Sequence, residues 1–410
     1  MTRRSSCSAG RTCAISVSVC RGLTPALRKT WPFVLAVFVA SRVFFFAVGA
    51  IGHAYVDFAY PGGSPREPPG FLDYWAHWDG GWYAAIADHG YFNPASTSFF
   101  PLYPLLVRFA DYLPGGTAFW GVTVSVLCLL ATLYFLYELA EELFDVRVAR
   151  ATTLAFAFFP SAFFMNAVYS ESVFLAATTG TIWALRVRRH FLLACLFAYF
   201  ALAARNVGVF LLVPLLYELF WRRRTRLWEG VLGLVGSLGG LAAYMLYLAK
   251  GLGDPLYFAV AQRETWGRAL TNPIHTMHKA WTTGIFGARY ALHPHAIFGT
   301  SSPEPAFKAA DTFNLVLFGI LVVLVVLGAF KLPLDLWVYS VLVILAPILT
   351  PSPLWALTSF NRYLLACFPL FVVLGWALAR SRILLGAWLA ASAALGVYLT
   401  VLFVTWRWVA

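Results

Sequence analysis

Long apolar segments separated by short polar turns run through the chain from residue 32 to residue 404. A bilayer core needs about 20 apolar residues per helix, and shorter spans occur inside a bundle. The pattern predicts about eleven transmembrane helices, at residues 32–52, 118–137, 151–169, 172–186, 190–204, 207–221, 228–249, 311–330, 335–350, 363–379 and 383–404. Pro160 and Pro214 fall inside two of them, so kinked or broken helices are expected there. The predicted fold class is an all-α polytopic integral membrane protein.

The composition supports a membrane protein. Of the 410 residues, 60% are hydrophobic and only 12% are charged, whereas soluble domains carry roughly 25% charged residues. The net charge of +12 could suit nucleic acid, but many of the cations stand in short clusters between apolar segments, where they orient helices. No nucleic-acid partner is therefore expected. The six cysteines form no CxxC pair, which argues against a zinc site and a disulfide framework.

The distribution of Lys and Arg predicts the orientation in the membrane. If residues 1–30 form a basic cytoplasmic tail, the tail and the short turns on its side carry eighteen Lys and Arg, against eleven in the longer segments opposite. The positive-inside rule favours this arrangement, and a signal peptide over the same residues is the weaker alternative. Residues 31–410 then form a single multi-pass transmembrane domain, with outer loops at about 53–117, 250–310 and 351–362.

The run His77-Trp78-Asp79-Gly80-Gly81-Trp82-Tyr83 sets a carboxylate among aromatic rings and a histidine just after the first apolar segment. A carboxylate at an aromatic-lined membrane surface can accept a proton from a hydroxyl group, and burial raises its basicity. Asp79 is the leading candidate base, and Asp73 and Asp88 are alternatives. Ion pairing or helix capping would explain the same acids without chemistry. No HxxxH or DxD pattern supports a metal, so no metal site is expected.

Three further charged residues fall beside outer turns of the predicted bundle. Glu171 lies at the tip of a short hairpin, where an acid either faces water or has a partner or a role, because unpaired charge is unfavourable at membrane depth. Arg205 and Arg362 lie at later outer turns, where an arginine can hold a lipid phosphate with two hydrogen bonds. Ordinary contact with lipid headgroups is the alternative. Together these groups indicate that the outer face is the active one.

Several of these motifs resemble the phosphatidylinositol-glycan class V (PIG-V) mannosyltransferase family. The similarity covers about residues 32–380, with its motifs in order along the chain. It is carried by the run from His77-Trp78-Asp79-Gly80 to Gly90-Tyr91, by Phe99-Phe100-Pro101-Leu102-Tyr103-Pro104-Leu105, by Phe159-Pro160-Ser161-Ala162-Phe163-Phe164 with Tyr169-Ser170-Glu171-Ser172, by Ala204-Arg205-Asn206-Val207-Gly208 and by Asn361-Arg362-Tyr363.

The resemblance implies a GT-C glycosyltransferase, a multi-span membrane enzyme whose donor is a polyprenyl-phosphate sugar, normally mannose. In that class an acid in the first outer loop acts as the base, which corresponds to Asp79. Eukaryotic relatives add the second mannose of the glycosylphosphatidylinositol anchor. This compact chain resembles a bacterial branch, so a plasma-membrane location and a cell-envelope glycan or glycolipid acceptor are expected. No cofactor is expected, because the donor arrives already activated on lipid.

The resemblance also implies roles for individual residues. Asp79 is expected to deprotonate an acceptor hydroxyl, which attacks the anomeric carbon and inverts it, while Arg362 and Arg205 stabilise the departing lipid phosphate. Trp78, Trp82 and Tyr83 are expected to stack against sugar rings. The full set of expected substrate-binding residues is His77, Trp78, Trp82, Tyr83, Asp88, Tyr91, Glu171, Arg205, Arg263, Trp266, Asn361, Arg362 and Tyr363.

A polytopic transporter or lipid flippase is the main alternative, because intramembrane Arg and Glu often mark substrate pathways. Transporters frequently contain internal repeats, and none is evident between the two halves of this sequence. The polar groups also gather on one face of the membrane and not at its midplane, which favours surface chemistry. A scaffold subunit with a degenerate active site is the third possibility.

Overall fold

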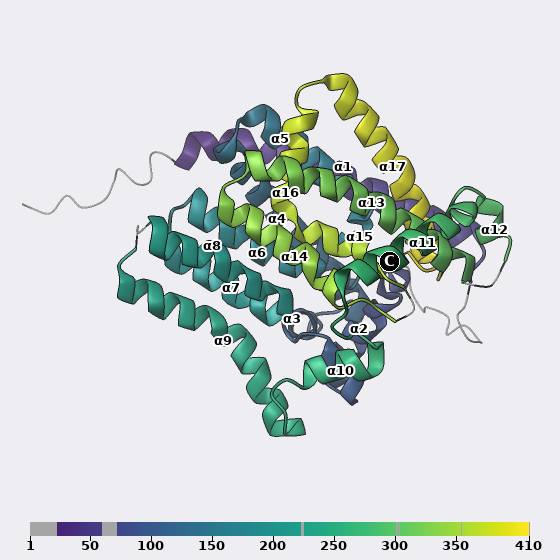
Figure 1. Ribbon diagram of the computed structural model, residues 1–410, viewed down its shortest axis with the longest axis horizontal. Coiled ribbons are helices and arrows are strands. Elements are labelled where there is room, and N and C mark those ends of the chain that lie inside the picture. The colour runs from purple at the N-terminus through teal and green to yellow at the C-terminus, as the bar shows by residue number, and fades with distance from the viewer. Residues whose placement is uncertain are drawn as a thin grey trace, which may run out of the picture.

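The computed structural model describes residues 23–59, 72–222, 225–300, 302, 304–353 and 355–409. Every regular element in these ranges is a helix, so the predicted all-α class is confirmed. Figure 1 shows the longer helices packed beside one another in a bundle. Of the predicted tail, residues 1–22 lie outside the described residues, and residues 23–30 belong to the start of α1.

Within the part of the chain that the structure describes, five helices are long and apolar enough to cross a membrane. They are α1 (Leu23–Tyr55), α4 (Gly116–Leu143), α9 (Leu227–Leu252), α13 (Glu304–Lys331) and α17 (Arg382–Val404). The pair Phe360–Ala366 and Phe368–Leu378, bent by 84°, makes a sixth if it is counted as one span. The chain is therefore a multi-pass membrane protein, but the predicted count of about eleven spans is not confirmed.

The two predicted spans that contain Pro160 and Pro214 are interrupted. In 151–169, α5 (Val146–Ala157) ends before Pro160, whose ring is incompatible with a continuing helix, and the chain then forms the 3₁₀ turn η3 (Ala162–Met165). The segment 207–221 divides into η4 (Asn206–Leu211), α8 (Leu212–Tyr217) and the π-helical turn η5 (Glu218–Arg222). The expectation of broken helices at these two prolines agrees with the structure.

Arg42 of α1 compensates for the break after α5. Its buried guanidinium donates hydrogen bonds to the carbonyl oxygens of Ala157 (3.3 Å) and Ala162 (3.1 Å), and to the side chain of Asn166. The last carbonyls of a helix have no partner within the helix, so a buried helix end needs donors from elsewhere. One cation from the first span thus satisfies the irregular backbone inside the bundle.

Helix α6 (Glu171–Arg186) lies at the centre of the bundle between α4 and α7 (Phe191–Ala204). Its polar residues are buried too: the hydroxyl groups of Thr179 and Thr181 donate to the carbonyls of Leu175 (2.6 Å) and Ala177 (2.8 Å). A helix buried on all sides has little freedom to shift. Glu171, its first residue, is therefore held in a fixed position.

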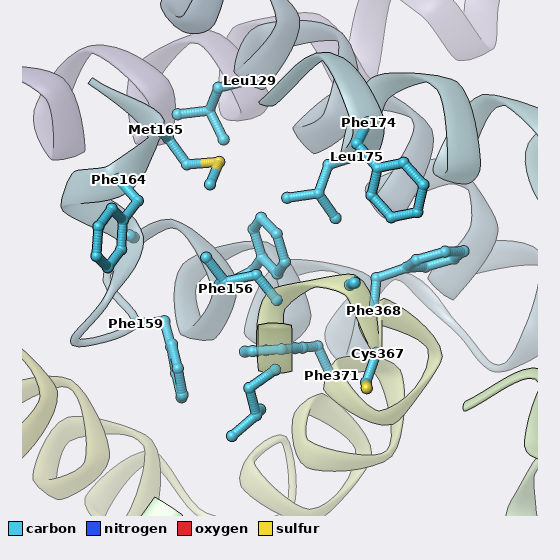
Figure 2. Close-up of a cluster of buried hydrophobic side chains, with 14 of the residues drawn as sticks. Leu129, Phe156, Phe159, Phe164, Met165, Phe174, Leu175, Cys367, Phe368 and Phe371 are labelled. Atoms are coloured by element: carbon cyan, nitrogen blue, oxygen red, sulfur yellow. The ribbon is translucent and has the colours of Figure 1, made fainter. Parts of the chain in front are cut away.

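Aromatic side chains fill the space between α5, α6 and α16 (Phe368–Leu378), as Figure 2 shows. Phe371 of α16 meets Phe156 and Phe159 edge to face, with ring centroids 4.9 and 5.0 Å apart. Such pairs contribute about 0.5–1.5 kcal/mol beyond their buried area. They hold α16 against α5, and α16 directly follows the segment that carries Arg362.

The two ends of α6 carry separate groups of buried charges. At its C-terminal end, Arg186 pairs with Glu218 (3.2 Å) and with Asp335 of α14 (Leu334–Leu349). Glu171 lies at the opposite end, about 22 Å away for a helix of this length. The short helices α2 (Asp79–His89) and α10 (Tyr257–Trp266) lie at the Glu171 end.

The predicted outer loop 250–310 is largely helical. It contains α10, α11 (Pro273–Ala291) and α12 (Pro294–Phe298). Helix α11 approaches the spanning helix α13 so closely that a Cβ atom on Gly287 would lie 1.9 Å from the carbonyl oxygen of Lys308. The prediction treated this segment as a loop because its polar residues interrupt the apolar pattern.

Gly375 allows an equally close approach between α16 and α5, and its substitution tests this packing. A Cβ atom there would lie 2.0 Å from Oγ1 and 2.7 Å from the backbone nitrogen of Thr152. Gly375→Ala should destabilise the protein by about 1–3 kcal/mol through overpacking, seen as a lower melting temperature in detergent. Gly386→Ala in α17, where no heavy atom lies within 4 Å, is the control. Equal melting temperatures would contradict the packing described.

Candidate active site

A cavity of about 350 Å³ opens at the Glu171 end of the bundle. Its walls come from α2, α6, α10, α14 and η4, together with the segment around Arg362. One end is polar and contains Asp79, Glu171, Arg205, Arg268 and Arg362. The other lining residues include a group of apolar side chains, Phe99, Phe100, Phe174, Leu175, Phe258, Val343, Pro347 and Leu365, and uncharged polar residues such as Gln262, Thr350 and Ser359. The cavity therefore suits a ligand with one charged end and one apolar end.

Asp79 is the first residue of α2, where the helix dipole favours a negative side chain. Trp78, directly before it, has a φ of 58°, which is uncommon for a residue with a side chain. Strained residues of this kind persist where the surroundings hold them, often at functional sites. Here the surroundings include Tyr169, whose hydroxyl donates to the carbonyl of His77 at 3.1 Å.

Four charged side chains form a continuous chain of ion pairs along the polar end. Nη1 of Arg362 lies 2.6 Å from Oδ2 of Asp79 and 3.7 Å from Oε1 of Glu171. The same Glu171 oxygen lies 2.6 Å from Nη1 of Arg205. The side chains of Glu171 and Arg362 are 4% and 9% exposed, whereas Asp79 is 19% exposed and faces the cavity. Asp79 is thus the most accessible of the three.

Three guanidinium groups lie around the aromatic ring of Tyr363. The central carbons of Arg205, Arg362 and Arg268 lie 5.2, 5.6 and 5.8 Å from its centroid, within the range of cation–π attraction. With the carboxylates of Asp79 and Glu171 ionised, three cations face two anions. This end of the cavity therefore carries an excess positive charge and favours an anionic ligand group.

Tyr83 closes the site on the side of α2. Its hydroxyl lies 2.7 Å from Oγ of Ser170, the residue before Glu171. Burial raises the pKa of Tyr83 above its usual value, so the phenol stays protonated at physiological pH and remains a hydrogen-bond donor.

The structure gathers about half of the expected site residues around this cavity. Those that line it are Asp79, Tyr83, Glu171, Arg205, Trp266, Arg362 and Tyr363. Those that do not line it are His77, Trp78, Trp82, Asp88, Tyr91, Arg263 and Asn361.

Most residues of the second group have structural partners. Trp82 stacks on Phe92 and Phe99, with ring centroids 5.7 and 5.6 Å away, and the hydroxyl of Tyr91 donates to the carbonyl of Phe99 at 2.7 Å. Buried Asn361 donates to the carbonyl of Val409.

The remaining members lie at the edge of the site or at the surface. Trp78 meets Trp408 edge to face, with centroids 4.9 Å apart, beside the cavity. Asp88 accepts a hydrogen bond from Thr117, and exposed Arg263 pairs with Glu264 at 3.7 Å.

Gln262, Arg268 and Trp408 line the cavity although the sequence expectation omitted them. Phe258, Ala259, Gln262 and Trp266 of α10 line the cavity, whereas Arg263 does not. Helical spacing from Trp266 could have added Gln262, four residues before it, to the expected set, but could not have excluded Arg263, three residues before it. No comparable signal exists for Trp408, which reaches the site from the far end of the chain.

No group of three or more His, Cys, Asp or Glu that could hold a metal ion occurs among the residues that the structure describes.

Comparisons with known proteins identify the fold and a family resemblance. Residues 68–220 match the sequence model of the family described as mannosyltransferase (PIG-V). GPI mannosyltransferase 2 of Drosophila pseudoobscura pseudoobscura is 30% identical over 116 residues, which are 25% of this chain and 25% of that protein. The crystal structure of ArnT from Cupriavidus metallidurans bound to undecaprenyl phosphate has a TM-score of 0.52 to this chain at 16% identity, covering 87% of this chain and 62% of ArnT.

The fold is therefore that of the GT-C class of multi-pass membrane proteins. Within this class the resemblance to the PIG-V mannosyltransferases is confirmed. The matched segment spans only a quarter of the curated relative, and the chain aligns with less than two thirds of ArnT.

His77 gives a test of the structure beside Asp79. Its ring stacks on Trp406 with centroids 4.1 Å apart, and burial lowers its pKa to about 3. In the unfolded chain the pKa of this ring is near 6.5. Between about pH 6.5 and pH 3 the unfolded chain therefore binds a proton that the folded protein does not bind, so the free energy of unfolding falls as the pH is lowered through this range.

Lowering the pH from 7 to 5 should therefore destabilise the wild type more than His77→Gln, by about 2 kcal/mol. The gap between their melting temperatures should narrow at the lower pH. A gap that stays constant would show that His77 is not a buried neutral residue.

Proposed function

We propose that this protein is a membrane glycosyltransferase that transfers mannose from a polyprenyl-phosphate-mannose donor to a cell-envelope glycan or glycolipid. The observation that carries this proposal is the chain of ion pairs from Asp79 through Arg362 and Glu171 to Arg205, which lines a cavity with apolar walls. The match of residues 68–220 to the mannosyltransferase (PIG-V) family supports mannose as the sugar.

The cavity has the two surfaces that such a donor needs. Its cationic end can pair with the phosphate through guanidinium groups, which bind phosphate oxygens with two hydrogen bonds at once. Its apolar walls can take the first prenyl units. ArnT, whose fold this chain shares, was crystallised with undecaprenyl phosphate, a lipid of this chemistry.

Asp79 is the group best placed to act as the base. It is the more accessible acid of the ion-pair chain, and it lines the cavity together with the aromatic residues Tyr83 and Trp408. Its carboxylate accepts the proton of an acceptor hydroxyl as the oxygen attacks the anomeric carbon of the sugar. The bond between that carbon and the phosphate oxygen breaks, and attack from the opposite face inverts the configuration.

Arg362 and Arg205 act on the leaving group. As the glycosidic bond breaks, negative charge develops on the phosphate, and fixed guanidinium groups in a water-poor site stabilise that charge. Arg362 contacts both Asp79 and Glu171, so its position relative to the base is set before any ligand arrives.

The proposed orientation places this reaction on the extracytoplasmic face of the plasma membrane, with the N-terminus in the cytoplasm. Short arginine-rich turns support it, among them Arg186, Arg188 and Arg189 at the far end of α6 from Glu171.

Asp79→Asn tests the base directly. The amide cannot accept the proton, so kcat should fall by about 10²–10⁴-fold while the protein still reaches the membrane and folds. The measurement is transfer of labelled mannose from polyprenyl-phosphate mannose by the purified protein in nanodiscs.

Asp254→Asn is the matched control. Asp254 accepts a hydrogen bond from the backbone nitrogen of Leu256 at 2.8 Å, away from the cavity lining, and asparagine can replace it in that role. Near-normal transfer by Asp79→Asn would rule out Asp79 as the base.

Arg362→Gln and Arg362→Lys test the phosphate contact. Glutamine removes the charge and should lower kcat/KM by about 10²–10³-fold, whereas lysine keeps the charge without the planar fork and should retain part of the activity. If both variants transfer mannose like the wild type, Arg362 does not stabilise the leaving group.

A further inference from the structure

Glu171 is a buried acid in contact with the two arginines that are proposed to bind the lipid phosphate, and the proposed function gives it no role. A site that binds a lipid phosphate gains from free guanidinium groups, yet Glu171 occupies two of them, with Oε1 2.6 Å from Arg205 and 3.7 Å from Arg362. Its side chain is 4% exposed, so water screens these contacts little. A buried acid in this position competes with any phosphate for the same two arginines.

The charges of donor and product explain why this competition is useful. If the donor is a phosphodiester, it carries one negative charge, whereas the lipid phosphate released is a monoester that carries about −1.5 to −2 at neutral pH. Transfer therefore increases the negative charge at the cationic end of the cavity. With only Asp79 to oppose them, Arg205, Arg268 and Arg362 would hold the product more tightly than the donor.

We propose that Glu171 is a positioning residue that keeps Arg205 and Arg362 together and limits their hold on the product, so that polyprenyl phosphate leaves after each transfer. This inference rests on the proposed function. Three features carry it: one carboxylate oxygen contacts both guanidinium groups, the acid is the first residue of a helix buried on all sides, and it lines the cavity beside Asp79.

The proposal gives Glu171 and Asp79 different kinetic signatures. Glu171→Gln keeps the shape of the side chain and removes the competing charge, so undecaprenyl phosphate should bind about tenfold more tightly or more. The donor KM and kcat should then both fall, because product release becomes slower, and inhibition by added undecaprenyl phosphate should strengthen. Asp79→Asn, in contrast, should lose the chemical step itself.

The experiment measures the Kd of undecaprenyl phosphate for the full-length protein in nanodiscs, by titration calorimetry, in parallel with steady-state kinetics. Glu304→Gln is the matched control, because this acid is 69% exposed and pairs only with Lys308 among the contacts of the described residues. It should leave both the Kd and the product inhibition unchanged.

Glu171→Asp provides a second variant if Glu171→Gln fails to fold. This substitution keeps the charge but shortens the side chain by one methylene group, which moves the carboxylate away from Arg362. The Kd of undecaprenyl phosphate should therefore fall by about threefold. A purely structural role for Glu171 would lower the melting temperature of both variants without tightening the Kd.

The outcomes separate this inference from the proposed function. Tighter binding in the Glu171 variants with a lower donor KM and kcat supports the inference. An unchanged or weaker Kd in these variants, while the wild type binds undecaprenyl phosphate and transfers mannose, overturns the inference alone. A wild type that neither binds undecaprenyl phosphate nor transfers mannose overturns both.

Discussion

The ion pair between Arg362 and Asp79 is the interaction on which the candidate site depends. It joins a turn near the end of the chain to the first residue of α2, and Glu171 extends it to Arg205. Removing one partner of a largely buried ion pair leaves the other charge uncompensated, so each member of this chain of ion pairs fixes the others. The packing of α6 on all sides and of α16 on α5 then determines where these charges stand. The site is therefore a property of the whole bundle and not of any one loop.

The fold class could be predicted from the sequence because backbone groups in lipid must form hydrogen bonds within the protein, as they do in a helix. The boundaries of the helices could not be predicted in this way. The predicted span 151–169 ends early because Pro160 interrupts it, and the freed carbonyls are tolerated through Arg42, which lies more than a hundred residues away. The same limit applies to the site. Asp79 and Glu171 stand out in the sequence because charges are rare in apolar surroundings, but no local pattern shows that one arginine joins them.

Aromatic residues were the least predictable part of the site. Trp82 was expected to stack on a sugar ring, and in the structure its ring stacks on Phe92 and Phe99. A sequence shows that a ring is present near an acid, but not whether a ligand or another ring covers it. Arg268 was missed for a related reason: it follows Gly267, which ends α10 in a left-handed conformation, so helical periodicity does not apply to it.

The proposed chemistry and the proposed role of Glu171 both treat the cationic end of the cavity as a binding site for lipid phosphate. The most direct test is a cryo-EM structure of the full chain in nanodiscs with undecaprenyl phosphate. The account predicts the phosphate in contact with Arg205 and Arg362, with its prenyl chain along the apolar residues of the cavity. A phosphate bound elsewhere, out of contact with both arginines, would contradict the account.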